Sequence, residues 1–330
     1  METNALLIVK DLEVVYTSGH TVVQAVNGID FSLERGETLG LVGETGAGKT
    51  TTALTLLRLL PDRTGRVLKG SVIFDDVPLL ELSEAEIQAI RGARISMIFQ
   101  DPMTALNPVI PIGPQIEEAL FLHNTEGHGQ AALAARVDEM LELVGIPAIR
   151  KKEYPHQFSG GMKQRVVIAM ALACSPELLI ADEPTTALDV TIQAQVLEQM
   201  CVLKEKMNMS MILITHDLGI VAKTCDKVAV LYCGEIVEYG TFEDFYVGQR
   251  HHPYTAGLFG SIPDIYGEEA RLNPIEGMLP DPTDLPPGCK FHPRCPQAMA
   301  LCKRQLPPAY AMGSHQIKCH LFASEADRHG

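Results

Sequence analysis

Hydrophobic positions follow two different spacings along the chain. Residues 5–15 and 22–33 alternate apolar and polar side chains on either side of a Ser-Gly-His turn, which predicts an antiparallel sheet at one edge of the fold. Shorter, mostly apolar runs predict further strands at 38–42, 70–75, 95–99, 177–183 and 211–215.

Apolar residues at helical spacing predict helices between these strands. The predicted helices cover 51–60, 83–91, 112–145, 159–173 and 191–207, and Gly and His residues at 125–129 interrupt the third. Pro61 ends the first helix, and Ser159 is a natural N-cap for the fourth. The alternation of strands and helices indicates an α/β fold in which 112–145 is a helical insertion.

One loop between a strand and a helix carries the clearest chemistry. Residues 43–50 read Gly-Glu-Thr-Gly-Ala-Gly-Lys-Thr, which matches the phosphate-binding P-loop pattern G-x-x-x-x-G-K-[ST]. The glycines let successive backbone N–H groups turn toward a polyphosphate, and the N-terminus of the next helix adds its positive dipole end. Lys49 would reach the β and γ phosphates, and the Thr50 hydroxyl would hold Mg²⁺.

Composition and charge restrict the function classes. The 330 residues include 41 Asp and Glu against 27 Lys and Arg, a formal charge of −14, so no broad nucleic-acid surface is expected. The length favours two domains. Residues 1–10 lack the pattern of a secretory signal, and the longest apolar run, 166–174, is far shorter than the roughly 20 residues of a membrane span. We therefore expect a soluble chain in a reducing compartment, where its eight cysteines favour metal binding over disulfides.

Polar residues at the ends of the predicted strands add candidate catalytic groups. Gln100 opens a proline-rich loop, where its amide could touch a metal ion and a mobile partner. Asp182 fits a contact to Mg²⁺, Glu183 fits the base that polarises an attacking water, and His216 fits a γ-phosphate contact. Tyr16 offers an aromatic face on which a base could stack. Taken singly, Tyr16 and His216 would more often have a structural role, and Gln100 would as often belong to a simple turn.

A second helix N-terminus is also suited to a phosphate. Ser159, Gly160 and Gly161 precede an apolar helix, and the paired glycines allow close approach of a ligand to the backbone. Because the chain already has a P-loop, this second site is expected to serve a nucleotide held by another molecule.

The order and spacing of these motifs resemble those of ATP-binding cassette (ABC) ATPases. The resemblance rests on the P-loop, Gln100, the signature at 159–161, the strand that ends at 182–183, the segment 187–189 and His216. A narrower resemblance, to ATPase subunits of bacterial dipeptide, oligopeptide and nickel importers, rests on 99–102, 105–108, 154–161, 252–255 and the C-terminal cysteines.

This resemblance implies a P-loop NTPase fold with a RecA-like core, an antiparallel β subdomain and an α-helical subdomain at about residues 100–175. It covers about residues 5–250. We therefore expect a nucleotide-binding domain at 1–250 and a small Pro- and Cys-rich, loop-rich segment at 251–330 with a regulatory or metal-cluster role.

The resemblance also implies that ATP lies between two cassettes that meet head to tail. One chain would contribute Tyr16, Gly43, Glu44, Thr45, Gly46, Ala47, Gly48, Lys49, Thr50 and Thr51. The opposite chain would contribute Ser159, Gly160, Gly161 and Gln164, and Asp189 is a further expected nucleotide contact. Thr50, Gln100 and Asp182 would form the Mg²⁺ environment. Glu183 would be the general base, and Gln100 and His216 would assist catalysis.

An importer ATPase of this kind implies a set of partners. These are a second ATPase subunit, expected to be a homologue, two integral membrane permease subunits and an extracytoplasmic solute-binding protein. The chain would lie on the cytoplasmic face of the bacterial plasma membrane and couple ATP hydrolysis to peptide uptake. Nickel or another small solute is an alternative cargo. A soluble ABC ATPase that acts on nucleic acid or the ribosome is an alternative from another class, which the acidic balance and single cassette disfavour.

The composition changes after about residue 248, where prolines break any regular pattern. A short helix is expected at 251–262, and the remainder should dock on the cassette or be stapled because it has few apolar residues. A tail that senses a metal and regulates the cassette is a further alternative.

Eight cysteines fall into two groups by their surroundings. Cys289, Cys295, Cys302 and Cys319 could hold a [4Fe-4S] cluster or Zn²⁺, or could be free or disulfide-bonded. Their wide spacing favours the cluster over zinc, and the importer resemblance implies the same. The other four lie singly in apolar or helical surroundings and are predicted to be small core residues: Cys174, Cys201, Cys225 and Cys233.

Overall fold

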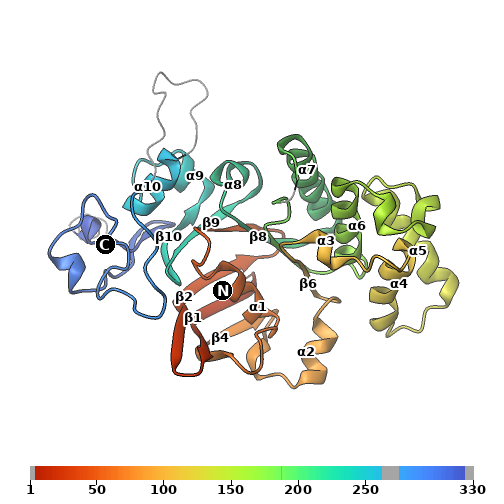
Figure 1. Cartoon of the computed structure of the whole chain (residues 1–330), viewed down its shortest axis with the longest axis horizontal. Helices are drawn as coiled ribbons and strands as arrows, with labels where there is room; N and C mark the ends of the chain where they lie inside the picture. Colours follow the sequence, from red (N-terminus) through yellow and green to blue (C-terminus); the bar gives the residue numbers. More distant parts are fainter. Residues whose placement is uncertain (1–3, 187, 262–274, 324–330) are drawn as a thin grey trace. The chain divides into compact units, whose positions relative to one another are not determined.

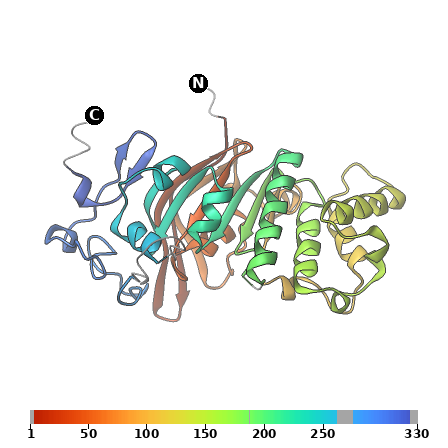
Figure 2. The ribbon, with the colours of Figure 1, turned by 90° about the horizontal axis from the view of Figure 1, so that it is seen from above.

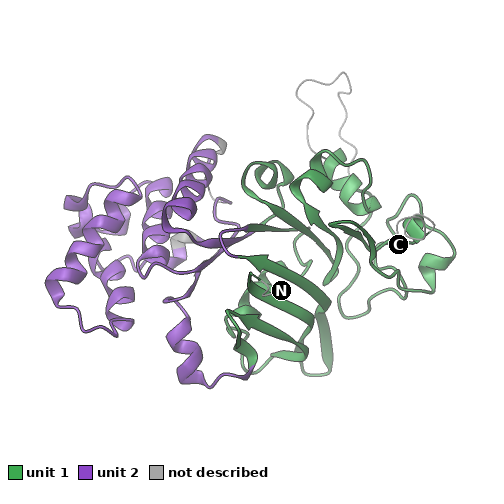
Figure 3. Ribbon diagram, turned by 180° about the vertical axis from the view of Figure 1, so that it is seen from behind, with its two compact units in different colours: residues 1–34, 38–80, 214–330 green, residues 35–37, 81–213 purple. Residues whose placement is uncertain are grey.

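The computed structural model describes residues 4–186, 188–261 and 275–323 (Figure 1). Of the predicted features, Ala187, Ile262 and the tail residues 263–274 and 324–330 lie outside these ranges. The chain divides into two compact units (Figure 3). Unit 1 comprises 1–34, 38–80 and 214–330, and unit 2 comprises 35–37 and 81–213.

The first sheet of unit 1 is antiparallel, as the alternating pattern predicts. Its order is β2-β1-β4-β5, with β1 (Ala5–Ser18), β2 (Thr21–Glu34), β4 (Gly65–Phe74) and β5 (Val77–Pro78). Val14 lies opposite Val26, and Leu7 lies opposite Phe74, and all four side chains are buried. The alternation is visible in the sequence because one face of these strands is buried.

The second sheet of unit 1 positions the P-loop. In it, β3 (Thr38–Val42) pairs in parallel with β9 (Lys227–Tyr232), which pairs antiparallel with β10 (Glu235–Thr241). Every residue of β3 is buried, as expected for a strand within a parallel sheet. The helices of this unit are α1 (Lys49–Leu56), α8 (Leu218–Thr224), α9 (Phe242–Tyr246) and α10 (Pro253–Gly260). A 3₁₀ turn, η1 (Leu79–Glu81), follows β5.

The helix after the P-loop is shorter than predicted. The prediction was 51–60, whereas α1 covers Lys49–Leu56. Arg58 has a left-handed backbone conformation, with φ of 51°, which does not continue a right-handed helix. The helix therefore ends before Pro61, the residue that was expected to end it.

The C-terminal tail contains strands that the sequence analysis missed. β11 (Tyr310–Met312) and β12 (His315–Ile317) form a hairpin, and β12 adds antiparallel to β10. The sheet order in this unit is therefore β11-β12-β10-β9-β3. Two 3₁₀ turns, η4 (Leu301–Lys303) and η5 (His320–Phe322), complete the tail. Strands of three residues are too short to show a hydrophobic period, although their pairing docks the tail on the sheet.

Unit 2 contains a short parallel sheet and most of the helices. Its strands are β6 (Ile95–Ile98), β7 (Leu178–Asp182) and β8 (Ser210–Thr215), in the order β8-β7-β6. Only residues 210–213 of β8 belong to this unit. The helices are α2 (Glu84–Ile90), α3 (Pro102–Ala105), α4 (Ile112–Leu122), α5 (Gln130–Leu143), α6 (Gly160–Leu172), α7 (Val190–Met207), and the 3₁₀ turns η2 (Ala148–Lys152) and η3 (Pro155–Gln157).

Two helices of unit 2 matter most for the site. α6 and α7, both green, lie side by side (Figure 2). The predicted interruption at 125–129 is confirmed, because it falls between α4 and α5. Within the described ranges, none of the helices combines the length and the apolar character that a membrane span requires.

Candidate functional site

The P-loop connects β3 to α1 in a shape that only glycine permits at two positions. Gly48 is the N-cap of α1 with φ of 103°, and a Cβ there would lie 2.4 Å from the carbonyl oxygen of Ala25. A Cβ at Gly43 would lie 2.3 Å from the carbonyl oxygen of Leu231. Neighbouring backbone therefore lies directly against the loop and leaves no room for a side chain.

Lys49 joins the two ends of the loop. Its Nζ donates hydrogen bonds to the carbonyl oxygens of Gly43 (2.7 Å) and Glu44 (3.1 Å), and the residue is only 5% exposed. Thr50 is exposed at the start of α1. The Tyr16 hydroxyl donates to the side-chain oxygen of Thr51 over 3.4 Å, so the structure brings this tyrosine beside the loop. Tyr16, Lys49 and Thr50 therefore all lie at the P-loop or directly beside it in unit 1.

The predicted catalytic carboxylate lies in unit 2, directly after β7. Glu183 Oε2 accepts hydrogen bonds from Gln100 Nε2 and Thr186 Oγ1, each over 3.0 Å. Asp182, the last residue of β7, is 2% exposed. Two donors on one oxygen orient the Glu183 carboxylate, and the residue is partly exposed.

His216 belongs to unit 1 and follows β8. The residue is exposed, and the next residue, Asp217, caps α8 by accepting from the backbone N–H of Gly219 over 2.7 Å. The Asp217 N–H itself donates to the hydroxyl of Thr215 over 3.0 Å. The turn that carries His216 is therefore held on both sides while its imidazole reaches solvent.

The signature residues form the N-terminus of α6 in unit 2. Ser159 Oγ accepts from the backbone N–H of Met162 over 3.4 Å, which confirms the predicted N-cap. A Cβ at Gly161 would lie 2.7 Å from Cγ2 of Ile192 on α7, so the close packing of these helices needs glycine there.

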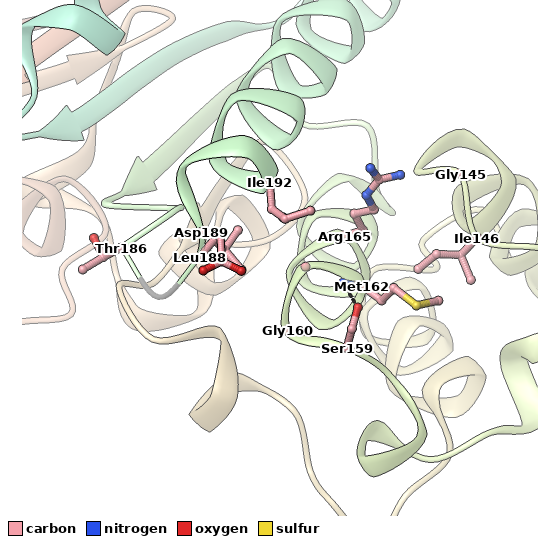
Figure 4. Close-up of a pocket in the computed structure, with 11 residues that line it drawn as sticks. Gly145, Ile146, Ser159, Gly160, Met162, Arg165, Thr186, Leu188, Asp189 and Ile192 are labelled. Carbon is pink, nitrogen blue, oxygen red and sulfur yellow. Dashed lines mark hydrogen bonds between the residues drawn. The ribbon is translucent and has the colours of Figure 1, made fainter.

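A pocket opens between this helix end and the start of α7 (Figure 4). The residues that line it are Gly145, Ile146, Ser159, Gly160, Gly161, Met162, Arg165, Thr186, Leu188, Asp189 and Ile192. The structure thus brings Asp189 to the signature. Gln164, also a predicted nucleotide contact, is fully buried and does not line this pocket.

Two residues outside the predicted site contact the P-loop. The Tyr254 hydroxyl accepts a hydrogen bond from the backbone N–H of Glu44 over 3.0 Å, and Arg294 forms an ion pair with the Glu44 carboxylate. Both come from the C-terminal segment, about 210 and 250 residues along the chain from Glu44. No periodicity or motif signals so distant a contact, so sequence reasoning could not find it.

The four C-terminal cysteines line one pocket in unit 1, together with His252, Phe291 and His292, among others. They are Cys289, Cys295, Cys302 and Cys319, and all are free thiols. Burial raises the pKa of Cys289 and of Cys319 to about 11, so a metal would displace a proton from each thiol on binding. Convergence of four sulfur ligands fits either a cluster or a single metal ion.

The remaining cysteines only partly match the prediction of small core residues. Cys225 and Cys233 are buried, whereas Cys174 and Cys201 are half-buried. Burial raises the pKa of Cys233 to about 12, which keeps its thiol protonated and inert. Cys174 follows the end of α6 and Cys201 lies on α7, and both positions are only partly covered, which apolar neighbours in sequence did not reveal.

Family comparisons agree with the fold and the motifs. Residues 26–186 match the family model described as "ABC transporter", and residues 237–302 match "Oligopeptide/dipeptide transporter, C-terminal region". A solved dimeric structure of MJ0796, a bacterial ABC transporter cassette, superposes with a TM-score of 0.64 at 25% identity. The match covers 72% of this chain and 98% of that chain.

Curated relatives extend the match over the whole chain. The dipeptide transport ATP-binding protein DppD of Bacillus subtilis is 50% identical over 98% of this chain and 96% of its own length. The oligopeptide transport ATP-binding protein AppD of the same organism is 47% identical over 98% of each chain. This chain therefore belongs to the ABC transporter ATPases, within the family of dipeptide and oligopeptide transport ATP-binding proteins.

Proposed function

We propose that this chain is the motor subunit of an importer that uses ATP hydrolysis to take up dipeptides or oligopeptides. The observation that carries the cargo class is the match of residues 237–302 to the C-terminal region of oligopeptide and dipeptide transporters, together with near-complete coverage of peptide transport relatives. The alternative cargo, nickel or another small solute, has no comparable support.

The residues of unit 1 would bind the nucleotide. Backbone N–H groups of 43–51 would cradle the phosphates, Lys49 would turn from its two carbonyl oxygens to the β and γ phosphates, and Tyr16 would stack on the base. Thr50 would contribute its exposed hydroxyl to Mg²⁺, and His216 would contact the γ phosphate. Bound Mg²⁺ would supply charge neutralisation at the phosphates.

The residues of unit 2 would supply the base and the contacts to a second nucleotide. Asp182 and Gln100 would complete the Mg²⁺ environment, and Glu183, oriented by Gln100 and Thr186, would take the proton of the attacking water. The pocket at the signature would receive the nucleotide of an opposing cassette through Ser159, Gly160, Gly161 and Asp189. Gln164, buried behind this surface, would support it from within the helix.

We further propose the assembly in which this motor works. A homologous ATPase subunit would complete the two nucleotide sites, two integral membrane permease subunits would receive the motion, and an extracytoplasmic solute-binding protein would deliver the peptide. The chain would lie at the cytoplasmic face of the plasma membrane. The names of the relatives and the dimeric state of the MJ0796 cassette support this arrangement.

We also propose that Cys289, Cys295, Cys302 and Cys319 hold a [4Fe-4S] cluster of structural role. The four thiols share one pocket, and their wide intervals along the sequence favour a cluster over a single zinc ion. The cysteines belong to the segment that we propose at residues 251–330. For the rest of the chain, we propose a nucleotide-binding domain at residues 1–250 with its helical subdomain at about 100–175. Anaerobic purification should yield about four iron and four sulfide per chain. Zinc in place of iron, or no metal, would refute the cluster.

The cargo is tested with the reconstituted transporter. ATPase activity of the complex is measured in lipid with the solute-binding protein empty, loaded with a dipeptide, loaded with a longer peptide, or offered a nickel complex. Stimulation by peptide alone is expected. Stimulation only by nickel, or equal activity in every arm, would overturn peptide uptake while leaving the ATPase assignment intact.

A further inference from the structure

The Cys-rich segment contacts the P-loop through a single arginine. Arg294 Nη1 lies 2.7 Å from Glu44 Oε2, and Arg294 Nη2 lies 3.0 Å from Glu44 Oε1, so the guanidinium and the carboxylate form a two-pronged ion pair. The Arg294 side chain is 5% exposed and that of Glu44 is 33% exposed. A bidentate pair with one buried partner fixes direction as well as distance, unlike most surface ion pairs.

Glu44 is held at three points. Its carboxylate is bound by Arg294, its N–H donates to the Tyr254 hydroxyl over 3.0 Å, and its carbonyl oxygen accepts from Lys49 over 3.1 Å. Two of these three contacts come from the C-terminal segment. The backbone of the P-loop at its second residue is therefore positioned by residues outside the cassette core.

Arg294 is itself held firmly. Its Nε donates to the carbonyl oxygen of Glu276 over 3.1 Å, and Nη1 also reaches the Tyr232 hydroxyl at 3.4 Å. Beneath it, the rings of Tyr232, Tyr254 and Phe291 contact one another with centroids 4.7 to 5.4 Å apart. Such a packed aromatic group leaves the arginine little freedom to follow another partner.

Electrostatics explains why the P-loop would need this contact. A carboxylate at position 44 stands in a loop built for a polyphosphate, and an uncompensated negative charge there would repel the ligand. An arginine guanidinium keeps its positive charge across the physiological pH range, so Arg294 compensates the Glu44 carboxylate permanently. We propose that Arg294 is a positioning residue for ATP binding, which neutralises Glu44 and holds the start of the P-loop open for the phosphates.

This inference rests on ATP binding by the P-loop and does not require the cysteine pocket to hold a cluster. The test compares full-length wild type with Arg294→Gln, Arg294→Lys and the matched control Arg304→Gln, an exposed arginine on the same segment. For Arg294→Gln, the dissociation constant of MgATP and the KM for ATP should rise about tenfold, with kcat within about twofold. For Arg294→Lys, the dissociation constant of MgATP should lie between those of wild type and Arg294→Gln, because lysine keeps the charge but cannot form the bidentate ion pair. Arg304→Gln should match wild type.

A second substitution separates electrostatics from lost packing. Adding Glu44→Gln to Arg294→Gln removes the unpaired charge, so MgATP affinity should recover most of the tenfold loss, whereas a general packing defect would not be rescued. Wild-type affinity in Arg294→Gln, an equal loss in Arg304→Gln, or no recovery in the double variant would overturn the proposal. Failure of wild type to bind MgATP would instead refute the ATPase assignment, and iron content measured on the same samples reports separately on the cluster.

Discussion

Glu183 directly follows β7 with a backbone φ of 45°, a left-handed conformation that costs a non-glycine residue about 1 kcal/mol. The conformation places its carboxylate within 3.0 Å of both Gln100 and Thr186. Two acids after an apolar run predicted a catalytic strand end. The backbone strain and the paired donors are additional features at the same residue, and both fit a group held for chemistry.

Glu183→Gln tests the role of this carboxylate. The amide keeps the size of the side chain but cannot accept a proton from water, so ATP turnover should fall by about 10²- to 10⁴-fold while MgATP affinity changes little. Steady-state hydrolysis and equilibrium binding of a fluorescent ATP analogue measure the two effects. Lys49→Ala is the contrasting variant, in which binding itself should weaken. Near-normal turnover in Glu183→Gln would exclude it as the general base.

At the scale of elements, β12 attaches the tail to the sheet through a buried acid on β10. Glu238 is 0% exposed, and its Oε1 accepts from His251 Nδ1 and His315 Nε2, each over 2.9 Å. Its Oε2 accepts from the backbone N–H of His252 over 2.7 Å. Burial alone would raise the pKa of Glu238, but the hydrogen bonds from both imidazoles outweigh it and hold the pKa below its ordinary value of 4.5.

This lowered pKa predicts acid sensitivity. Because Glu238 is a stronger acid in the folded chain, its contribution to stability is complete above about pH 4.5 and is lost as the pH falls through the folded pKa. Glu238→Gln should therefore flatten the acid limb of the unfolding free energy and cost about 2 kcal/mol at pH 7. Urea unfolding between pH 3.5 and 7 measures both.

Glu243→Gln is the matched control for this experiment. Glu243 lies on α9, near the same strands, but is exposed. Its substitution should leave the acid limb unchanged. An acid limb that persists in Glu238→Gln, or vanishes in Glu243→Gln, would show that another group controls the response.

At the scale of the whole molecule, the Cys-rich segment is part of unit 1 and reaches both the sheet edge and the P-loop. Besides β12 and Arg294, the carbonyl oxygen of Pro282 accepts from the N–H of Gln24 on β2 over 2.9 Å. The segment has few apolar residues with which to hold this shape. A bound cluster would then contribute directly to its folding.

Cys302→Ser tests this structural role. It should abolish iron binding and lower Tm by about 5–10 °C, since loss of a metal centre costs a few kcal/mol of folding free energy. Calorimetry on anaerobic samples measures the shift. Cys201→Ser, on α7 in unit 2, is the control and should keep both iron and Tm. An unchanged Tm in iron-free Cys302→Ser would rule out a structural contribution.

The sequence alone determined the parts of this protein whose chemistry is local. The P-loop, the Ser159 N-cap, the Asp182-Glu183 strand end and the alternation of β1 and β2 each depend on residues within a few positions of one another, so spacing was enough to predict them. Local patterns failed at Arg58, where a left-handed backbone conformation does not continue the predicted helix. They also failed at β11 and β12, because these strands are too short to show a hydrophobic period.

Only the tertiary structure decided which distant residues meet. Arg294 and Glu44 are 250 positions apart, and the partners of Glu238 come from a loop and a strand that no pattern joins to it. The sequence also did not predict that Gln164 is buried or that Cys174 and Cys201 are partly exposed. Such contacts depend on how whole elements pack, and packing is a property of the folded chain, whereas a motif is a property of neighbouring residues.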